Sequence, residues 1–162
     1  MRLRSADRGF TLVELVAVLV VLGIIAAVAS FRFAGGRGAV AVGPEADVLV
    51  SRLRLAQTLA MTRGARHCLN LTAGAHRITH TNCGTNAALP AGDVNPLSFD
   101  ASVTATWTNL PSALVSFDTL GRPATDAAGT LLAATATITL SGPDGATTTV
   151  TIAPQTGRAV RP

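Results

Sequence analysis

The most constraining feature of this sequence is an apolar run near its N-terminus that contains one carboxylate. Between residues 10 and 33 the only ionisable side chains are Glu14 and Arg32. A helix over this range would be about 36 Å long, which is enough to span a bilayer core of about 30 Å. Three arginines precede the run: Arg2, Arg4 and Arg8. The positive-inside bias therefore predicts a cytoplasmic N-terminus and an external remainder of the chain.

Three interpretations of this run compete. It could be a plain membrane anchor, or a secretory signal peptide cut after Ala27-Val28-Ala29 and before Ser30. Alternatively, a short leader is removed before the apolar run, and the mature chain keeps its helix. Glu14 separates them, because a carboxylate within a spanning helix costs about 2.5 kcal/mol or more. Neither an anchor nor a signal peptide has a use for that charge, so the third interpretation is favoured.

The octet from Gly9 to Val16, GFTLVELV, resembles the class III leader of type IV pilins and type II secretion pseudopilins. The resemblance implies that a prepilin peptidase cuts between Gly9 and Phe10 and methylates the new amine of Phe10. It also implies that Glu14, the fifth residue of the mature chain, pairs with the N-terminal amine of a neighbouring subunit in a filament core. Such a pair offsets two charges that would each be costly in a low dielectric.

The remainder of the chain predicts one α+β domain. Helical spacing continues from about Glu45 to Thr62, where Gly64 ends it. The predicted buried stripe is Ala46, Leu49, Val50, Leu53, Ala56 and Ala60. Strands are predicted at 67–71, 76–81, 103–108, 113–117, 131–141 and 147–152, with a loop-rich insertion at 82–100. We expect a long N-terminal helix, half transmembrane and half amphipathic, packed on one half-buried antiparallel β-sheet.

The predicted organisation has four parts. They are a leader (1–9), a transmembrane and filament-core helix (10–33), a linker with an amphipathic helix (34–63) and a β-rich periplasmic domain (64–162). Cys68 and Cys83 both follow the apolar run, so an external domain would place them in an oxidising compartment. There they can form a disulfide that closes a loop of about 15 residues. The alternative is two buried free thiols.

Other chemistry finds little support in the sequence. His76 and His80 would face the same side of one strand, but no third ligand is positioned beside them. We therefore expect solvated histidines, no metal site and no cofactor. Nucleophile motifs, spaced carboxylate pairs and phosphate-binding glycine loops do not occur, so we do not expect an enzyme.

Further segments extend the resemblance over most of the chain. They are the Arg-rich helix from Leu49 to Arg63, the turn Phe117-Asp118-x-x-Gly121-Arg122-Pro123 and the ending Ile152-Ala153-Pro154-x-Thr156-Gly157-Arg158. Together with the leader they resemble the GspH/FimT family of minor pseudopilins and minor type IV pilins. Cys83-Gly84 and the later Ala88-Leu89-Pro90 are also similar to the mannose-sensitive haemagglutinin type, MshC.

The family resemblance implies a subunit of an inner-membrane-based filament that supports protein secretion or pilus biogenesis. Its partners would be other pilins or pseudopilins, the prepilin peptidase and the inner membrane. The first alternative is a DNA-binding minor pilin. Some FimT-like minor pilins bind DNA through a Gly-Arg-x-Arg motif in the C-terminal tail, and Gly157-Arg158-Ala159-Val160-Arg161 is similar to it. The extra residue would place Arg158 and Arg161 on opposite faces of an extended tail, although phosphate contacts tolerate loose geometry. The second alternative is a secreted β-rich domain with a conventional signal peptide.

Overall fold

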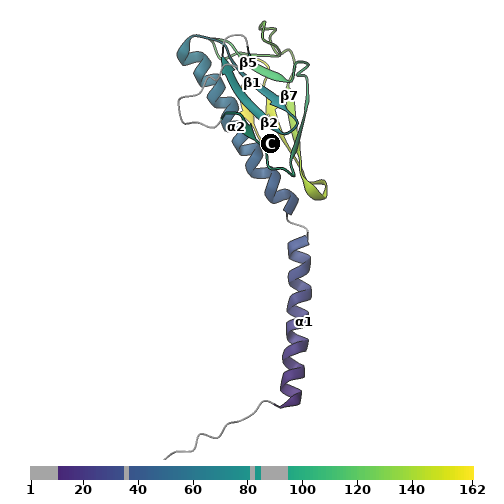
Figure 1. The fold of residues 1–162 in the computed structure, drawn as a ribbon. Helices are drawn as coiled ribbons and strands as arrows, with labels where there is room; N and C mark the ends of the chain where they lie inside the picture. The colour runs from purple at the N-terminus through teal and green to yellow at the C-terminus, as the bar shows by residue number, and fades with distance from the viewer. Residues whose placement is uncertain (1–10, 35–36, 81–82, 85–94) are drawn as a thin grey trace, which may run out of the picture. The chain divides into compact units, whose positions relative to one another are not determined.

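The computed structural model of this chain describes residues 11–34, 37–80, 83–84 and 95–162. The chain divides into two compact units, Met1–Gly36 and Arg37–Pro162. The predicted leader and the proposed cut between Gly9 and Phe10 lie outside the described residues. Each unit is considered by itself below (Figure 1).

The described part of the first unit is helix α1 (Leu12–Ala34). Thr11 begins it as the N-cap, because its carbonyl oxygen accepts from Leu15 N at 3.1 Å and its Oγ1 accepts from Glu14 N at 3.2 Å. The sequence predicts a transmembrane helix over 10–33. Within the part of the chain that the structure describes, no helix combines the length and apolarity of a membrane span.

Helix α2 (Arg37–Arg63) opens the second unit and starts earlier than the sequence predicts. Residues 37–44 precede the helix that the sequence predicts from about Glu45, yet they are helical, and Pro44 lies inside the helix. Pro44 cannot donate a backbone hydrogen bond. The buried Val42, one turn before Ala46, adds packing that offsets this loss. The helix ends before Gly64, whose φ of +61° suits a left-handed C-terminal cap.

The β-structure forms two antiparallel sheets instead of the single predicted sheet. The strands are β1 (His67–Thr72), β2 (Ala75–His80), β3 (Leu97–Ser98), β4 (Thr104–Thr108), β5 (Leu114–Phe117), β6 (Pro123–Ala124), β7 (Ala136–Ser141), β8 (Thr147–Ile152) and β9 (Ala159–Val160). One sheet has the order β3-β2-β1-β5-β6, and the other has the order β4-β7-β8-β9. A short 3₁₀ helix, η1 (Pro143–Gly145), joins β7 to β8.

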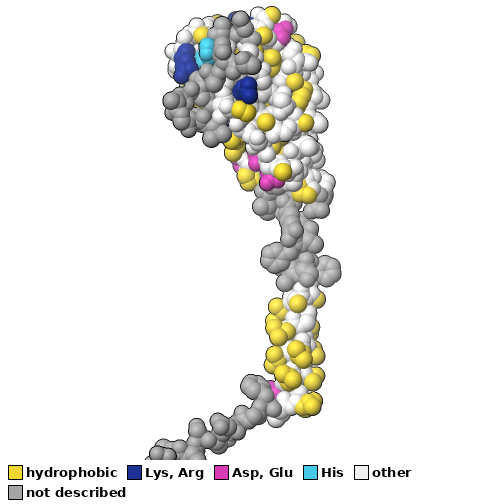
Figure 2. All heavy atoms as spheres, viewed as in Figure 1, with side chains coloured by type: hydrophobic (Ala, Val, Ile, Leu, Met, Phe, Trp, Pro, Cys, Tyr) yellow, Lys and Arg dark blue, Asp and Glu magenta, His cyan; other side chains and the backbone are white. Residues whose placement is uncertain are grey.

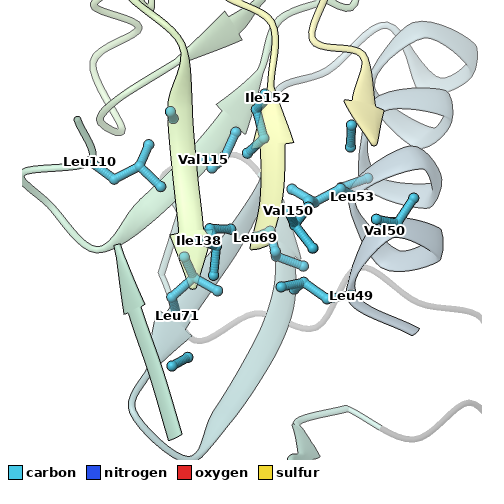
Figure 3. Close-up of a cluster of buried hydrophobic side chains, with 14 of the residues drawn as sticks. Leu49, Val50, Leu53, Leu69, Leu71, Leu110, Val115, Ile138, Val150 and Ile152 are labelled. Atoms are coloured by element: carbon cyan, nitrogen blue, oxygen red, sulfur yellow. The ribbon is translucent and has the colours of Figure 1, made fainter. Parts of the chain in front are cut away.

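A single hydrophobic core joins α2 to both sheets. Leu49 and Leu53 of α2 meet Leu69 of β1 and Val150 of β8 (Figure 3), and all four side chains are fully buried. The predicted helix stripe is buried throughout, from Ala46 to Ala60. The expected α+β fold, a helix packed on antiparallel β-structure, is thereby confirmed.

The second sheet follows the predicted alternation closely. Ala136, Ile138 and Leu140 of β7 are buried, and they pair with β8 in a six-residue register from Ala136↔Ile152 to Ser141↔Thr147. The opposite face carries hydroxyl side chains in matching positions on three strands. These are Thr104, Thr106 and Thr108 on β4, Thr137, Thr139 and Ser141 on β7, and Thr147, Thr149 and Thr151 on β8. This face is polar but uncharged.

Candidate functional site

The surface of α1 is apolar and open. Its described side chains, residues 12–27, are all exposed, and hydrophobic side chains cover the visible face of the helix (Figure 2). A shallow depression of about 340 Å³ runs along one side, lined by Glu14, Ala17, Val18, Val21 and Leu22. An isolated helix with apolar residues on every side cannot bury them within its own unit. Its surface is therefore open to contact with other apolar groups.

Glu14 is the one carboxylate on this apolar surface. It is the third residue of the helix, in the first turn, where a negative charge interacts favourably with the helix dipole. Its backbone N–H is already satisfied by Thr11 Oγ1, and its side chain borders the apolar depression. The arrangement provides an acceptor for a cationic donor from another molecule. Phe10, whose amine would be that donor in a neighbouring copy, lies outside the described residues.

The C-terminal tail does not place its two arginines together. Residues 159–160 form strand β9 at the edge of the second sheet, and Arg161 then turns to α2. Arg161 Nη1 donates to Gly43 O at 3.2 Å, and its Nε lies 3.4 Å from Asp47 Oδ1. Conversely, Arg54 of α2 donates from Nη2 to the carbonyl oxygen of Ala159 in β9 at 3.2 Å. Of the predicted DNA-contacting pair, Arg161 is thus engaged with the helix, whereas Arg158 is exposed.

Cys68 and Cys83 form a disulfide with their Cα atoms 5.3 Å apart. Cys68 is fully buried on β1, and Cys83 follows the end of β2. Asn70 donates from Nδ2 both to Thr79 Oγ1 at 2.9 Å and to the carbonyl oxygen of Cys83 at 3.3 Å. The bond and this side chain together fix the start of the 83–100 segment to the β1–β2 hairpin.

The expectation of solvated histidines is wrong for His76. Its ring is 2% exposed and packs against Phe99 with centroids 5.0 Å apart, and neither ring nitrogen has a hydrogen-bond partner. Burial, with a smaller contribution from the charge of Arg52, lowers the pKa of His76 from 6.5 to about 4. The expectation is wrong because the short strand β3 and the following Phe99 cover β2, and neither contact is evident from the sequence. Among the residues described, no three His, Cys, Asp or Glu side chains group as metal ligands.

A second buried histidine lies at the other end of the hairpin. His67 pairs across the strands with His80, and their ring centroids are 6.3 Å apart. Nδ1 of His67 lies 2.8 Å from the carbonyl oxygen of Ala65, whereas Nε2 has no partner. Burial lowers the pKa of His67, against the effect of the Ala65 hydrogen bond, and the charges of Arg63 and His80 lower it further.

Sequence reasoning missed a junction where two turns meet α2. Gln57 Nε2 donates to Gly121 O at 2.8 Å and to Thr156 O at 2.7 Å, so one helix side chain binds both turns. Gly157 fits between them with φ +65°, and a methyl group there would lie 2.8 Å from Phe117 Cε1 and 2.9 Å from Gly121 O. The sequence singles out both turns through the family resemblance, each with a glycine, Gly121 and Gly157, but it does not indicate that they meet.

The first of these turns is held by Asp118. Its Oδ1 accepts from Leu120 N at 3.0 Å and from Arg122 N at 2.8 Å, and its Oδ2 accepts from Arg122 Nε at 2.8 Å. Partial burial acts to raise the pKa of Asp118, but the hydrogen bonds from Arg122 and Leu120 and the charge of Arg122 lower it overall. Asp118 is therefore an anion that organises the turn's backbone.

Comparison with known proteins adds evidence at the N-terminus. Residues 4–30 match the family described as the prokaryotic N-terminal methylation motif. The chain thus carries a prepilin-type N-terminal motif, as its sequence predicts. Two crystal forms of the type IV minor pilin FimU of Pseudomonas aeruginosa are similar to this chain. One has 20% identity and a TM-score of 0.46 over 72% of this chain and 84% of FimU. The other has 17% identity and a TM-score of 0.49 over 72% and 89%. No curated protein matches the chain significantly.

Proposed function

We propose, taking the methylation motif as the premise, that this protein is a minor pilin or pseudopilin that joins a filament through α1. The motif at residues 4–30 is the observation that carries the proposal. It is supported by the exposed apolar surface of α1 and by Glu14, the carboxylate at the edge of that surface. The filament would start in the inner membrane and would serve type II secretion or type IV pilus biogenesis.

The proposed sequence of events begins with the precursor in the inner membrane, its N-terminus cytoplasmic and residues 37–162 periplasmic. Prepilin peptidase cleaves between Gly9 and Phe10 and methylates the new amine. The exposed side chains of α1 then exchange lipid for the helices of neighbouring subunits. In that low-dielectric core, Glu14 accepts hydrogen bonds from a neighbour's N-terminal amine, so that neither charge is left unpaired.

The first test is the mature N-terminus. Mass spectrometry of the membrane-extracted protein should find a chain that starts at Phe10 and carries one methyl group on its amine. A chain that starts at Ser30 would instead establish a secreted domain and refute the proposal.

The second test concerns Glu14. In a cross-linking assay on cells, Glu14→Ala should leave the processed protein in the membrane but remove it from the filament. Glu45→Gln is the control, because it removes a carboxylate from the globular unit but keeps an oxygen that can accept from Asp100 N, and it should assemble normally. Wild-type assembly by Glu14→Ala would rule out the intersubunit role of this carboxylate.

A further inference from the structure

The second unit exposes few large hydrophobic side chains, and two of them adjoin. In the described part of residues 37–162, Met61, Leu120 and Leu131 are the exposed large hydrophobics. Leu120 is 71% exposed, the most of the three. Met61 of α2 lies over Gly121, the residue that follows Leu120, because a methyl group on Gly121 would be 2.8 Å from Met61 Sδ. Leu120 and Met61 therefore border one small apolar surface at the C-terminal end of α2.

The backbone that presents Leu120 is braced far more than an ordinary surface turn. Gly121 N donates to Asp118 O at 2.9 Å, and Asp118 Oδ1 accepts from the backbone N–H groups of Leu120 and Arg122. Gln57 of α2 binds the carbonyl oxygen of Gly121. A leucine held outward in this way has no packing role within the unit. Its backbone, however, is already ordered for binding, which reduces the entropy cost of association.

Two arginines lie near this surface, and one of them sets its charge. Arg122 belongs to the turn itself and pairs with Asp118, so this ion pair adds no net charge. Arg158 follows Gly157, the residue that fits against the carbonyl oxygen of Gly121, and it is exposed. The positive charge beside the turn therefore comes from Arg158, and a carboxylate complements it.

We propose that Leu120 and Met61 form an anchor that inserts into an apolar pocket on another protein subunit, bordered by Asp or Glu side chains. The inference rests on the proposed function only in assigning that subunit to the same filament. A second copy of this chain is a poor occupant, because two such turns would bring like charges together. DNA would satisfy Arg158, but its phosphates offer nothing to the exposed side chain of Leu120.

The test uses the full chain in cells that assemble the filament. Leu120→Asp should reduce incorporation of the processed protein by about tenfold or more, as expected when an interface anchor is lost. Leu131→Asp is the matched control, since it changes another exposed leucine outside the braced turn and should incorporate within about twofold of wild type. Both purified variants should unfold at the wild-type temperature, because each side chain is exposed. Wild-type incorporation of Leu120→Asp would overturn the anchor.

Three further outcomes are decisive. If Glu14→Ala fails to incorporate while Leu120→Asp succeeds, the anchor is wrong and the proposed function stands; if both incorporate normally, both are wrong. A disulfide-linked homodimer of a Leu120→Cys chain would identify a second copy as the occupant and overturn the heterologous assignment. If the purified full chain in detergent binds a duplex DNA fragment at low salt, and Arg158→Gln abolishes this while Leu120→Asp does not, the surface is a nucleic-acid site and the proposal fails.

Discussion

Replacing Gly157 by alanine tests the junction between the two turns most directly. The backbone at Gly157 has φ +65°, which costs an L-residue about 1–2 kcal/mol. The added methyl group would also lie 2.8 Å from Phe117 Cε1 and 2.9 Å from the backbone oxygen of Gly121. Phe117 is fully buried and cannot move away easily, so overpacking should add about 1–3 kcal/mol. We expect Gly157→Ala to lower the free energy of unfolding by about 2–5 kcal/mol.

Substitutions of two other glycines separate the backbone cost from the cost of the close contacts. Gly145 has φ +72° but no atom within 4 Å of an added methyl group, so Gly145→Ala should show the backbone cost alone, about 1–2 kcal/mol. Gly74 has neither constraint, and Gly74→Ala should be neutral or stabilise by about 0.5 kcal/mol. The measurement is urea unfolding of residues 37–162, whose core lies entirely within that range. Equal losses for Gly157→Ala and Gly145→Ala would refute the argument from contact at the junction.

Three more predictions follow from the same unit. Gln57→Leu leaves the carbonyl oxygens of Gly121 and Thr156 without this donor and should cost about 1–3 kcal/mol in the same assay; no loss would mean that solvent replaces both bonds. Because the folded-state pKa of His76 is about 4, below 6.5, the unfolded chain takes up the proton first as pH falls. Stability should be full above pH 6.5 and fall by about 3 kcal/mol towards pH 4, and His76→Phe should remove that part of the pH dependence. Reducing the disulfide between Cys68 and Cys83 should lower the free energy of unfolding by about 3 kcal/mol, measured by urea unfolding with and without reductant. An unchanged midpoint of unfolding would contradict this prediction.

The parts of the fold that the sequence predicts are those with a long, regular pattern. The stripe from Ala46 to Ala60 and the alternation from Ala136 to Ser141 repeat over several turns or residue pairs, so the buried faces could be assigned without tertiary information. The start of α2 was missed because Pro44 and the preceding glycines indicate a boundary, whereas Val42 packs on a core that the sequence does not reveal.

The remaining differences come from long-range contacts. Strands β3, β6 and β9 have two residues each, too few for any periodicity, and they exist because longer strands lie beside them. The division into two sheets likewise depends on which strands pair across the fold. His76 was expected in solvent because local sequence cannot place Phe99 against it. For the candidate site, Glu14 stood out as a charge in an apolar run, but nothing local indicates that Gln57 binds two distant turns.

The tail contacts have a consequence for the order in which this unit can fold. Ala159 is buried in the core, Gly157 fills the junction, and Arg161 reaches back to Gly43 of α2. Residues 157–161 therefore complete the packing of the helix that opens the unit. A nascent chain that has been synthesised only as far as residue 156 lacks these contacts. The native unit should consequently form only after residue 161 is available, and a chain truncated after residue 156 should be recognised as unfolded by the cell's proteases.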